Sequence, residues 1–554
     1  GATVISSGGN VHTSGEGPRS HNLTRRQLLT RAGAVGAAAL ASEALSGTPA
    51  GWARLASQAA LVRPAGSDLE AVEHVIFLMM ENRSYDSYFG AYPRGQGFDD
   101  HPEDSLGVFA QDYPGGSHVH PRHKLLPFHF NQQCQNDPTH DWGPMHLCWD
   151  HGKMDAWVKV HTSSKYEGAD GTTVMGYYDR RDLGFYYALA DNFTLCDAYH
   201  CSVLGPTHPN RLMQLSGTID PGGGKGGPIT DTNFNPALRW TCTWTTMPEV
   251  LEEAGVSWKV YHPSNVGVSG KYSSLAKYPT WNPENYNPTT NPEVMFVSDH
   301  VLPYFKAFES PTSRLYQKAF NPTFPNQFVS DLKSGQLPKV SWIIPPLGFD
   351  EHPSGSPARG MFFTKLVLEA LLSHRHVWRK TALFLMYDEN GGFFDHVPPP
   401  TAPRGTRGEY LTAPPKGGNP TPDTLGIKGP IGLGVRVPML VISPFSRGGH
   451  IASELFDHTS QLKLIGHRFG VEVPNVSHWR RHTVGDLTST MLRSRHDAHV
   501  PRLPSIKIPN SGACSESSQD SELGGAATPV PKHQRMPKQG GGSTPARHYF
   551  GPGR

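Results

Sequence analysis

Four short apolar segments rich in β-branched residues set the strongest constraint on the fold of this chain. They are residues 74–80, 340–344, 381–387 and 436–442. Helical patterns lie between them, notably at 360–373 and 458–469. Short buried strands that alternate with helices favour a mostly parallel sheet covered by helices. We therefore predict an α/β/α sandwich in which two Pro/Asn-rich stretches, roughly 101–165 and 220–335, form large loop insertions.

Composition narrows the class of protein. The 554 residues include 59 glycines and 50 prolines, so many turns and loops surround a moderate core. Aromatic residues make up 10% and charged residues 18%, which argues against global disorder. The formal charge of +2 excludes a basic field broad enough to suggest nucleic acid as a partner. The 29 histidines favour an enzyme, because histidine is the commonest metal ligand and a proton shuttle near neutral pH.

The two ends of the chain differ from its middle. Residues 24–29 read Thr-Arg-Arg-Gln-Leu-Leu, and a mild apolar run follows over 32–41, far short of the roughly 20 residues of a membrane-spanning helix. This order predicts a twin-arginine export signal, and hence a secreted or envelope-associated protein without a transmembrane anchor. We assign 1–66 to a disordered N-terminus with this signal, 67–500 to the catalytic domain and 501–554 to a flexible Gly/Ser/Pro-rich tail.

The cysteines do not indicate a structural zinc site, because no C-x-x-C pair occurs among them. They are Cys134, Cys148, Cys196, Cys201, Cys242 and Cys514. Disulfides are permitted in an exported protein, and the sequence leaves their connectivity open. Cys196 and Cys201 can equally be small buried apolar side chains.

Three of the predicted strands lead into acidic groups. These are Glu81-Asn82 after 74–80, Asp350-Glu351-His352 after 340–344, and Asp388-Glu389 after 381–387. In open α/β sheets, sites form beyond the carboxyl ends of the strands, so these side chains are expected to converge. Converging carboxylates repel one another unless a cation lies among them. Solvated loop acids would explain one such group better than they explain three. The sequence therefore predicts a cation site.

A second motif, Gly205-Pro-Thr-His-Pro-Asn-Arg211, precedes an apolar helical pattern. Pro209 suits the first turn of a helix, which places Thr207 or His208 near its N-cap. A hydroxyl there faces free N–H groups and the positive end of the helix dipole, where phosphate binds readily. Thr207 is either a plain N-cap or, beside a metal, a nucleophile whose pKa the cation and the dipole both lower.

Histidines recur beside acids at His140, His396 and His458. An isolated histidine is more often a structural hydrogen-bonding group, whereas acid-flanked ones are candidates for protonating a leaving group. We expect His352 and His458 to be near the chemistry and His146 to be structural.

Aromatic residues in the insertions and nearby loops can hold a choline head group by cation–π contact, although packing is their commoner role. The candidates are Trp142, Trp149, Trp157, Tyr177, Tyr178, Trp258 and Tyr261.

Together the motifs resemble the bacterial phospholipase C, or phosphoesterase, family, which also has an acid phosphatase branch and plant members. The matching segments are 81–86, 88–90, 207–211, 351–353, 388–399, 434–444, 456–460 and 479–480, in order within roughly residues 70–490. Actinobacterial, mycobacterial-type phospholipases C are most similar, on 136–140, 145–147 and 256–261. The resemblance implies an alkaline-phosphatase-like fold.

The resemblance also implies roles for individual residues. A divalent metal ion (Ca, Mn, Zn or Mg) is implied at Glu81, Asn82, Asp388 and Glu389, with Thr207 as nucleophile and further ligand. His140, His352 and His458 are the implied catalytic histidines, and the implied substrate-binding residues are Asn210, His208, Asp395 and His396. Two positions depart from the family: Tyr85 stands where Phe is usual, and Ser87 where His is usual. The second puts a pocket role for that position in doubt.

We predict an exported phospholipase C that acts on phospholipid at a membrane surface. It would hydrolyse the glycerol-side phosphodiester of phosphatidylcholine-like lipids to diacylglycerol and a phosphorylated head group. The same machinery fits a phosphomonoesterase, and a non-catalytic surface protein that binds lipid is a third interpretation. A serine lipase is poorly supported, because no G-x-S-x-G elbow occurs. The sequence leaves head-group preference, metal identity and oligomeric state open.

Overall fold

The computed structural model describes residues 69–101, 106–120, 122–162, 171–232, 236–264, 268–275, 299–353, 355–416, 424–491, 504–507, 528–540 and 549–550. The predicted export signal lies outside these residues. Within them, the central sheet has the strand order β13-β12-β6-β11-β10-β1-β9-β7-β8. The strands are β1 (His74–Met80), β6 (Thr194–Cys196), β7 (Trp258–Pro263), β8 (Thr323–Phe324), β9 (Val340–Ile343), β10 (Thr381–Tyr387), β11 (Met439–Ile442), β12 (His450–Ala452) and β13 (Tyr549–Phe550).

The sheet is mostly parallel, as predicted. β1 pairs in parallel with β9 on one side and with β10 on the other, and Met80 lies opposite Tyr387. β11 runs antiparallel to both β10 and β6. It begins at Met439 rather than at 436, because the preceding Pro438 has no N–H to donate to a strand ladder.

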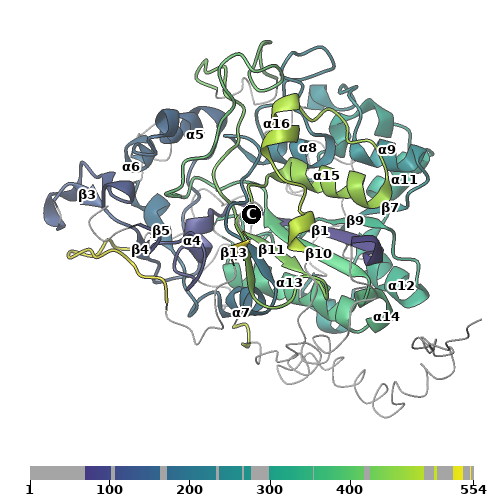
Figure 1. Cartoon of the computed structure of the whole chain (residues 1–554), viewed down its shortest axis with the longest axis horizontal. Helices are drawn as coiled ribbons and strands as arrows, with labels where there is room; N and C mark the ends of the chain where they lie inside the picture. The colour runs from purple at the N-terminus through teal and green to yellow at the C-terminus, as the bar shows by residue number, and fades with distance from the viewer. Residues whose placement is uncertain are drawn as a thin grey trace, which may run out of the picture.

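Helices cover both faces of the sheet, which confirms the predicted α/β/α sandwich. Figure 1 shows α8 (Thr207–Ser216) and α15 (His458–Phe469) on one side, and α7 (Gly184–Asn192) and α13 (Pro357–Leu372) on the other. α13 begins earlier than predicted, because Ser356 caps it by accepting a hydrogen bond from the Ala358 N–H. The remaining α-helices of the described chain are α4 (Tyr85–Phe89), α5 (Trp142–Trp149), α6 (Trp157–His161), α9 (Met247–Glu253), α11 (Arg314–Phe320), α12 (Asn326–Ser334), α14 (Arg375–Trp378) and α16 (His478–Thr483). No helix in the described part of the chain has the length and apolarity needed to cross a bilayer.

The stretch 220–335 is more than a loop insertion, because it supplies two strands of the central sheet. β7 pairs in parallel with β9, and the two-residue β8 pairs with the end of β7. The β7 sequence, Trp-Lys-Val-Tyr-His-Pro, has a lysine on a partly exposed edge and ends at a proline, so it lacks the continuous apolar run of β1. The strand was therefore missed in the sequence.

The other predicted insertion forms a lobe beside the sheet, at one end of the molecule in Figure 1. Its elements are β2 (Gln111–Asp112), β3 (Lys124–Leu125), β4 (Phe128–His129), β5 (Gly176–Tyr177), α5 and α6. Met145, Trp157 and Val174 belong to an apolar cluster of this lobe. The lobe is joined directly to the end of β1 through α4, whose Ser87 carbonyl accepts a hydrogen bond from the Tyr178 N–H.

Part of the expected tail contacts this lobe. The Thr528 hydroxyl donates to Asn131, and Gln534 is bonded through its side chain to Lys124 and Leu126. Cys134, in the same lobe, is disulfide-bonded. The cysteines Cys148, Cys196, Cys201 and Cys242 are free and buried.

Candidate active site

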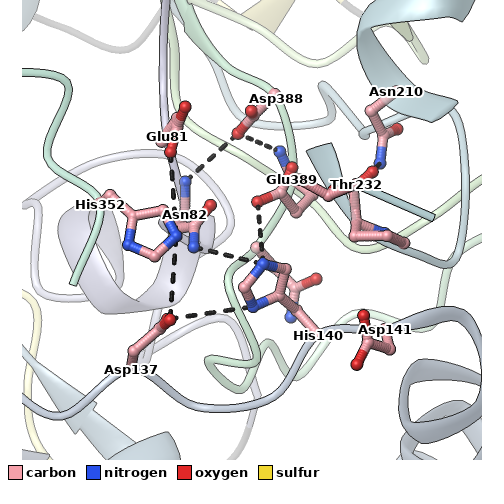
Figure 2. Close-up of polar contacts among 12 residues, drawn as sticks. Glu81, Asn82, Asp137, His140, Asp141, Asn210, Thr232, His352, Asp388 and Glu389 are labelled. Carbon is pink, nitrogen blue, oxygen red and sulfur yellow. Dashed lines mark hydrogen bonds and ion pairs between the residues drawn. The ribbon is translucent and has the colours of Figure 1, made fainter. Parts of the chain in front are cut away.

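The carboxyl ends of β1 and β10 bring two of the predicted acidic groups together. Because the two strands are parallel and in register, Glu81-Asn82 and Asp388-Glu389 leave the sheet side by side. The Asn82 N–H donates to Asp388 Oδ1 at 3.3 Å, and the Asp388 N–H donates to the Met80 carbonyl. Figure 2 shows these four side chains facing one region. The convergence expected from the strand ends is therefore present.

Two glycines after Glu389 let neighbouring loops approach this region. Gly391 and Gly392 have φ values of 56° and 74°. A Cβ at Gly391 would lie 2.4 Å from the Cβ of Asn82, and one at Gly392 would lie 2.7 Å from that of Pro138. Glycine is thus required where the loop that carries Glu389 passes between Asn82 and the segment leading to His140.

The third acidic group divides between two environments. Asp350 lies with Glu81 and Asp299, and one carboxylate oxygen from each lies within 4.8 Å of the others. Burial and the neighbouring Asp299 raise the pKa of Asp350 to about 7. Glu351 points elsewhere and accepts hydrogen bonds from the hydroxyls of Tyr88 at 2.5 Å and Tyr387 at 2.8 Å. Glu351 is therefore a structural residue.

A buried arginine partly balances the acids. Arg211 Nε lies 3.0 Å from Asp388 Oδ2, and its Nη2 lies 2.9 Å from Asp299 and 3.3 Å from Glu81. Burial opposes the charge of Arg211, but the carboxylates of Asp299 and Asp388 raise its pKa. Burial also raises the pKa of Glu81 well above its usual range, with Asp299 adding to the shift. One cation therefore faces an excess of carboxylates.

The side-chain oxygens of Glu389 and Asn82, which accept no hydrogen bond within the described part of the chain, suit a metal ion. Glu389 is fully buried, and neither of its carboxylate oxygens has a hydrogen-bond partner among the described residues; the same holds for Asn82 Oδ1. Buried acceptors without donors are costly, and carboxylate and amide oxygens are ligands for divalent cations. Burial and the adjacent Asp388 raise the pKa of Glu389. This donor set fits the implied divalent metal.

Thr207 is the first residue of α8 and is 2% exposed. Pro206 occupies the N-cap without a side-chain hydrogen bond to the helix, so the N-terminal N–H groups are not capped by it. Arg211 follows Thr207 by four residues and so lies on the same face of α8. Because Arg211 is bound to Asp388 and Glu81, the start of α8 lies against the acidic groups.

His140 and His352 stand at the edge of this cluster. Asn82 Nδ2 donates to His140 Nε2 at 3.4 Å, and Glu389 Oε1 lies 3.8 Å from the same nitrogen. His140 Nδ1 donates to the Pro138 carbonyl, which leaves a lone pair on Nε2 facing the cluster.

His352 Nε2 lies 3.8 Å from Asp137 and 3.9 Å from Glu81. Burial lowers the pKa of His352, but Asp137 and Asp350 outweigh it and raise the pKa above its ordinary value. Asp137 also lies 4.0 Å from His140, so it faces both histidines (Figure 2). Asp137 was not among the site residues predicted from the sequence, although its place three residues before His140 in the Asn-Asp-Pro-x-His segment 136–140 is a signal for it.

Asn210 and His208 are held by the protein itself. Asn210 Oδ1 accepts from the N–H groups of Ser202 and Val203, both at 2.9 Å, and its Nδ2 donates to the carbonyls of Gly205 and Pro206. Its amide thus fixes the loop before α8 rather than a substrate. His208 Nδ1 is paired with the Tyr304 hydroxyl at 2.8 Å.

His458 is also a positioning residue in this structure. Its Nε2 donates to the Asp388 carbonyl at 2.6 Å, and its Nδ1 accepts from the Tyr199 hydroxyl at 3.0 Å. Burial lowers the pKa of His458 to about 4, so the ring is neutral near pH 7. Both ring nitrogens are engaged, and this differs from the expectation that His458 protonates a leaving group.

Asp395 and His396 lie in a separate buried ionic network. Arg436 Nε donates to Asp395 at 2.9 Å and its Nη2 donates to Asp86 at 3.1 Å. His396 lies between two carboxylates, with Nδ1 at 2.7 Å from Asp86 and Nε2 at 2.9 Å from Asp100. All their polar atoms face protein partners, so the network joins α4 to the loop after β10. It does not present the substrate-binding groups that the resemblance implied.

The His396 network predicts an alkaline loss of stability. Burial opposes the charge of the His396 ring, but Asp86 and Asp100 raise its pKa to about 9. In the unfolded chain the pKa of a histidine is near 6.5. A raised histidine pKa stabilises the fold fully below about pH 6.5 and loses this contribution as pH rises through 9, roughly 3 kcal/mol in all. The free energy of unfolding, measured by denaturant titration, should be higher for the native protein than for His396→Gln near pH 6.5. This difference should shrink as the pH rises to 9. A difference in unfolding free energy that does not change with pH would contradict the ionic role of His396.

Six of the seven aromatic candidates for a choline cage are buried packing residues, and the seventh, Tyr177, is partly exposed and packs against the apolar cluster of the lobe. Trp142, Trp157, Tyr178, Trp258 and Tyr261 are each no more than 1% exposed, and Trp149 is 8% exposed. The Trp142 indole donates to the Ile427 carbonyl and the Trp258 indole donates to Glu252. His146 is structural, as predicted, because its two ring nitrogens bond the carbonyls of Trp142 and Pro430.

The sequence matches a known family and several named proteins. The model of the phosphoesterase family matches residues 72–472. Phospholipase C A of Mycobacterium tuberculosis is 41% identical over 479 residues, covering 84% of this chain and 85% of the relative. Phospholipase C B of the same organism is 40% identical over 537 residues, covering 93% and 96%. The non-hemolytic phospholipase C of Pseudomonas aeruginosa is 37% identical over 524 residues, covering 88% and 67%.

Proposed function

The chain belongs to the phosphoesterase family, and on that premise we propose that it is a phospholipase C that cleaves the glycerol-side phosphodiester of phospholipids. The observation that carries the proposal is that the buried Glu389 carboxylate and the Asn82 side-chain oxygen have no hydrogen-bond donors among the described residues, in the cluster that Arg211 joins to α8. That arrangement supports a phosphate held between a cation site and a helix N-terminus. The relatives named phospholipase C support the choice of a lipid phosphodiester as substrate.

In this proposal Thr207 is the nucleophile. Its hydroxyl oxygen forms a bond to phosphorus while the bond from phosphorus to the glycerol oxygen breaks, and the diacylglycerol oxygen takes up a proton. Water then releases the phosphorylated head group from the threonine. The positive end of the α8 dipole stabilises the charge on the phosphoryl oxygens in both steps.

The residues that would hold a divalent metal are Glu81, Asn82, Thr207, Asp388 and Glu389. Bound there, the metal would lower the pKa of the threonine hydroxyl and neutralise phosphoryl charge. Arg211 keeps Asp388 and Glu81 oriented and carries part of their charge.

The proton for the leaving group comes from one of the two histidines at the edge of the cluster. The carboxylates of Asp137 and Asp350 raise the pKa of His352 above its ordinary value, which favours its protonated form, and Asp137 lies 3.8 Å from its Nε2. His140 donates through Nδ1 to the Pro138 carbonyl and turns its Nε2 towards the cluster, where it is placed to accept a proton. Asn210, His208 and His458 hold the loop and strand ends in place and have positioning roles.

Export by the twin-arginine route is also part of the proposal. The Arg25-Arg26 motif and the apolar run after it support it. The disulfide at Cys134 is consistent with an oxidising compartment, because cytoplasmic thiols are kept reduced. Replacing both arginines with lysine should leave the precursor in the cytoplasm, which fractionation of the producing cells measures.

The experiment that tests the function is product analysis with phosphatidylcholine vesicles. We expect diacylglycerol and phosphocholine in equal amounts, and faster turnover of p-nitrophenyl phosphorylcholine than of p-nitrophenyl phosphate. The reverse preference, without diacylglycerol, would make the protein a phosphomonoesterase. Lipid binding without release of either product would make it a non-catalytic lipid-binding protein.

A further inference from the structure

The far end of the lobe carries a group of basic side chains outside the candidate site. Arg122, Lys532 and Arg535 are exposed, and none of them forms an ion pair with a described residue. Lys124 is exposed as well and pairs with Asp112, an exposed acid on the neighbouring strand. Four exposed histidines surround these cations: His118, His120, His123 and His533. We call this set of side chains the hairpin patch.

The hairpin patch is assembled from two segments that lie far apart in the sequence. The His120 N–H donates to the Lys532 carbonyl at 2.8 Å, and the Gln534 N–H donates to the His120 carbonyl at 3.1 Å. The side chain of Gln534 extends the contact by bonding Lys124 and Leu126. These backbone pairings hold the two segments that carry the exposed cations side by side. The patch is thus a built feature of the lobe.

Its position is on the side of the molecule that carries the candidate site. Figure 1 shows β3 and the yellow C-terminal segment at the outer end of the lobe, while α4 joins the lobe to the carboxyl end of β1. The helices α12 and α14 lie at the opposite end of the view. An attraction at the hairpin patch would therefore bring the lobe end of the molecule, rather than α12 and α14, to a charged surface.

We propose that the hairpin patch docks the protein on the anionic phospholipid head groups of a bilayer. This inference rests on the proposed function, since a phospholipase C must reach lipid packed in a membrane. Arginine and lysine near an anionic membrane attract its surface charge, and histidine N–H groups add donors to phosphate oxygens.

Two observations favour a bilayer over a nucleic acid. The whole chain carries a formal charge of only +2, so the patch is a local concentration of charge rather than part of a basic molecule. In the described parts of 111–125 and 531–538 the only tyrosine, tryptophan or phenylalanine is Tyr113, which is 6% exposed and offers no surface on which bases can stack.

The test uses the full chain with Arg122→Gln, Lys532→Gln and Arg535→Gln combined. The matched control replaces one lysine and two arginines at the opposite end of the molecule, as Lys333→Gln, Arg375→Gln and Arg379→Gln. Both sets are placed in a Thr207→Ala background, and sedimentation measures binding to vesicles of phosphatidylcholine with or without phosphatidylglycerol. Neutralising the patch should weaken binding to the anionic vesicles roughly a hundredfold, about fivefold per charge. The control set should bind like the parent, and added salt should weaken parent binding.

The proposal would be overturned if the patch and control substitutions weakened vesicle binding equally, or if the patch variant bound anionic vesicles as tightly as the parent. So would retention on duplex DNA by a parent protein that ignores anionic vesicles. Turnover of soluble p-nitrophenyl phosphorylcholine, measured with Thr207 intact, should not change in the patch variant, which confirms that its fold and site are preserved. If the protein hydrolyses no phospholipid but still binds vesicles through the patch, the proposed function fails while the docking surface stands.

Discussion

Thr207→Ala should lower kcat/KM on phosphatidylcholine roughly 10⁴-fold or more, because no other group can take over the bond to phosphorus. The substitution removes only a hydroxyl and a methyl group at the first residue of α8, and alanine favours the helix. Arg211 still ties the helix to Asp388 and Glu81. Turnover should therefore be lost while the denaturant midpoint stays near that of the native protein.

Two companion variants make the result specific. Thr207→Ser keeps a hydroxyl and should retain measurable turnover. Thr218→Ala changes a threonine just beyond the other end of α8 and should leave turnover intact. Acid quenching of the native reaction followed by mass spectrometry should find phosphocholine on the peptide that contains Thr207. Near-normal turnover by folded Thr207→Ala would reject the nucleophile assignment.

The sheet of this protein could be predicted where strands are long and uniformly apolar. β1 and β10 have seven residues each, all or nearly all buried, and their bounds match the segments 74–80 and 381–387. β6 and β12 have three residues each, which is too short for an alternation of apolar and polar residues to be recognised. Because the candidate site residues follow the long central strands, the position of the candidate cation site could be predicted from the sequence.

The roles of single polar side chains were harder to infer, since a sequence gives a residue type but not its partners. Asn210 and His458 stand in the motifs that led to the site, yet their polar atoms are used by the backbone of Ser202, Gly205 and Asp388. His396 is similar, because Asp86 lies hundreds of residues away in the chain and cannot be recognised as its partner without the fold. The sequence alone therefore does not distinguish an acid-flanked histidine that only makes structural hydrogen bonds from one that faces the candidate site, as His140 and His352 do.

Glu389 provides the sharpest test of the cation site. Glu389→Gln should weaken divalent-metal binding at least about a hundredfold, since even the loss of a group that only supports a ligand costs 10–100-fold. Elemental analysis of dialysed protein measures the bound metal directly, and turnover should fall with metal content. Titration of each divalent ion into metal-free protein, followed by thermal unfolding, should show stabilisation of the native protein and little of the variant.

The metal-free state distinguishes this role from a structural one. In chelator, Glu389→Gln should unfold at the same temperature as the native protein or higher, because it removes a buried carboxylate whose oxygens have no hydrogen-bond donors among the described residues. Glu369→Gln is the matched control: Glu369 is also buried, but it pairs with Lys271 at 3.2 Å and Lys365 at 3.4 Å. It should keep its metal and its turnover, and any loss of stability should be the same with and without chelator. A Glu389→Gln protein that binds metal like the parent, or that is destabilised in chelator as a broken ion pair would be, would place the cation elsewhere.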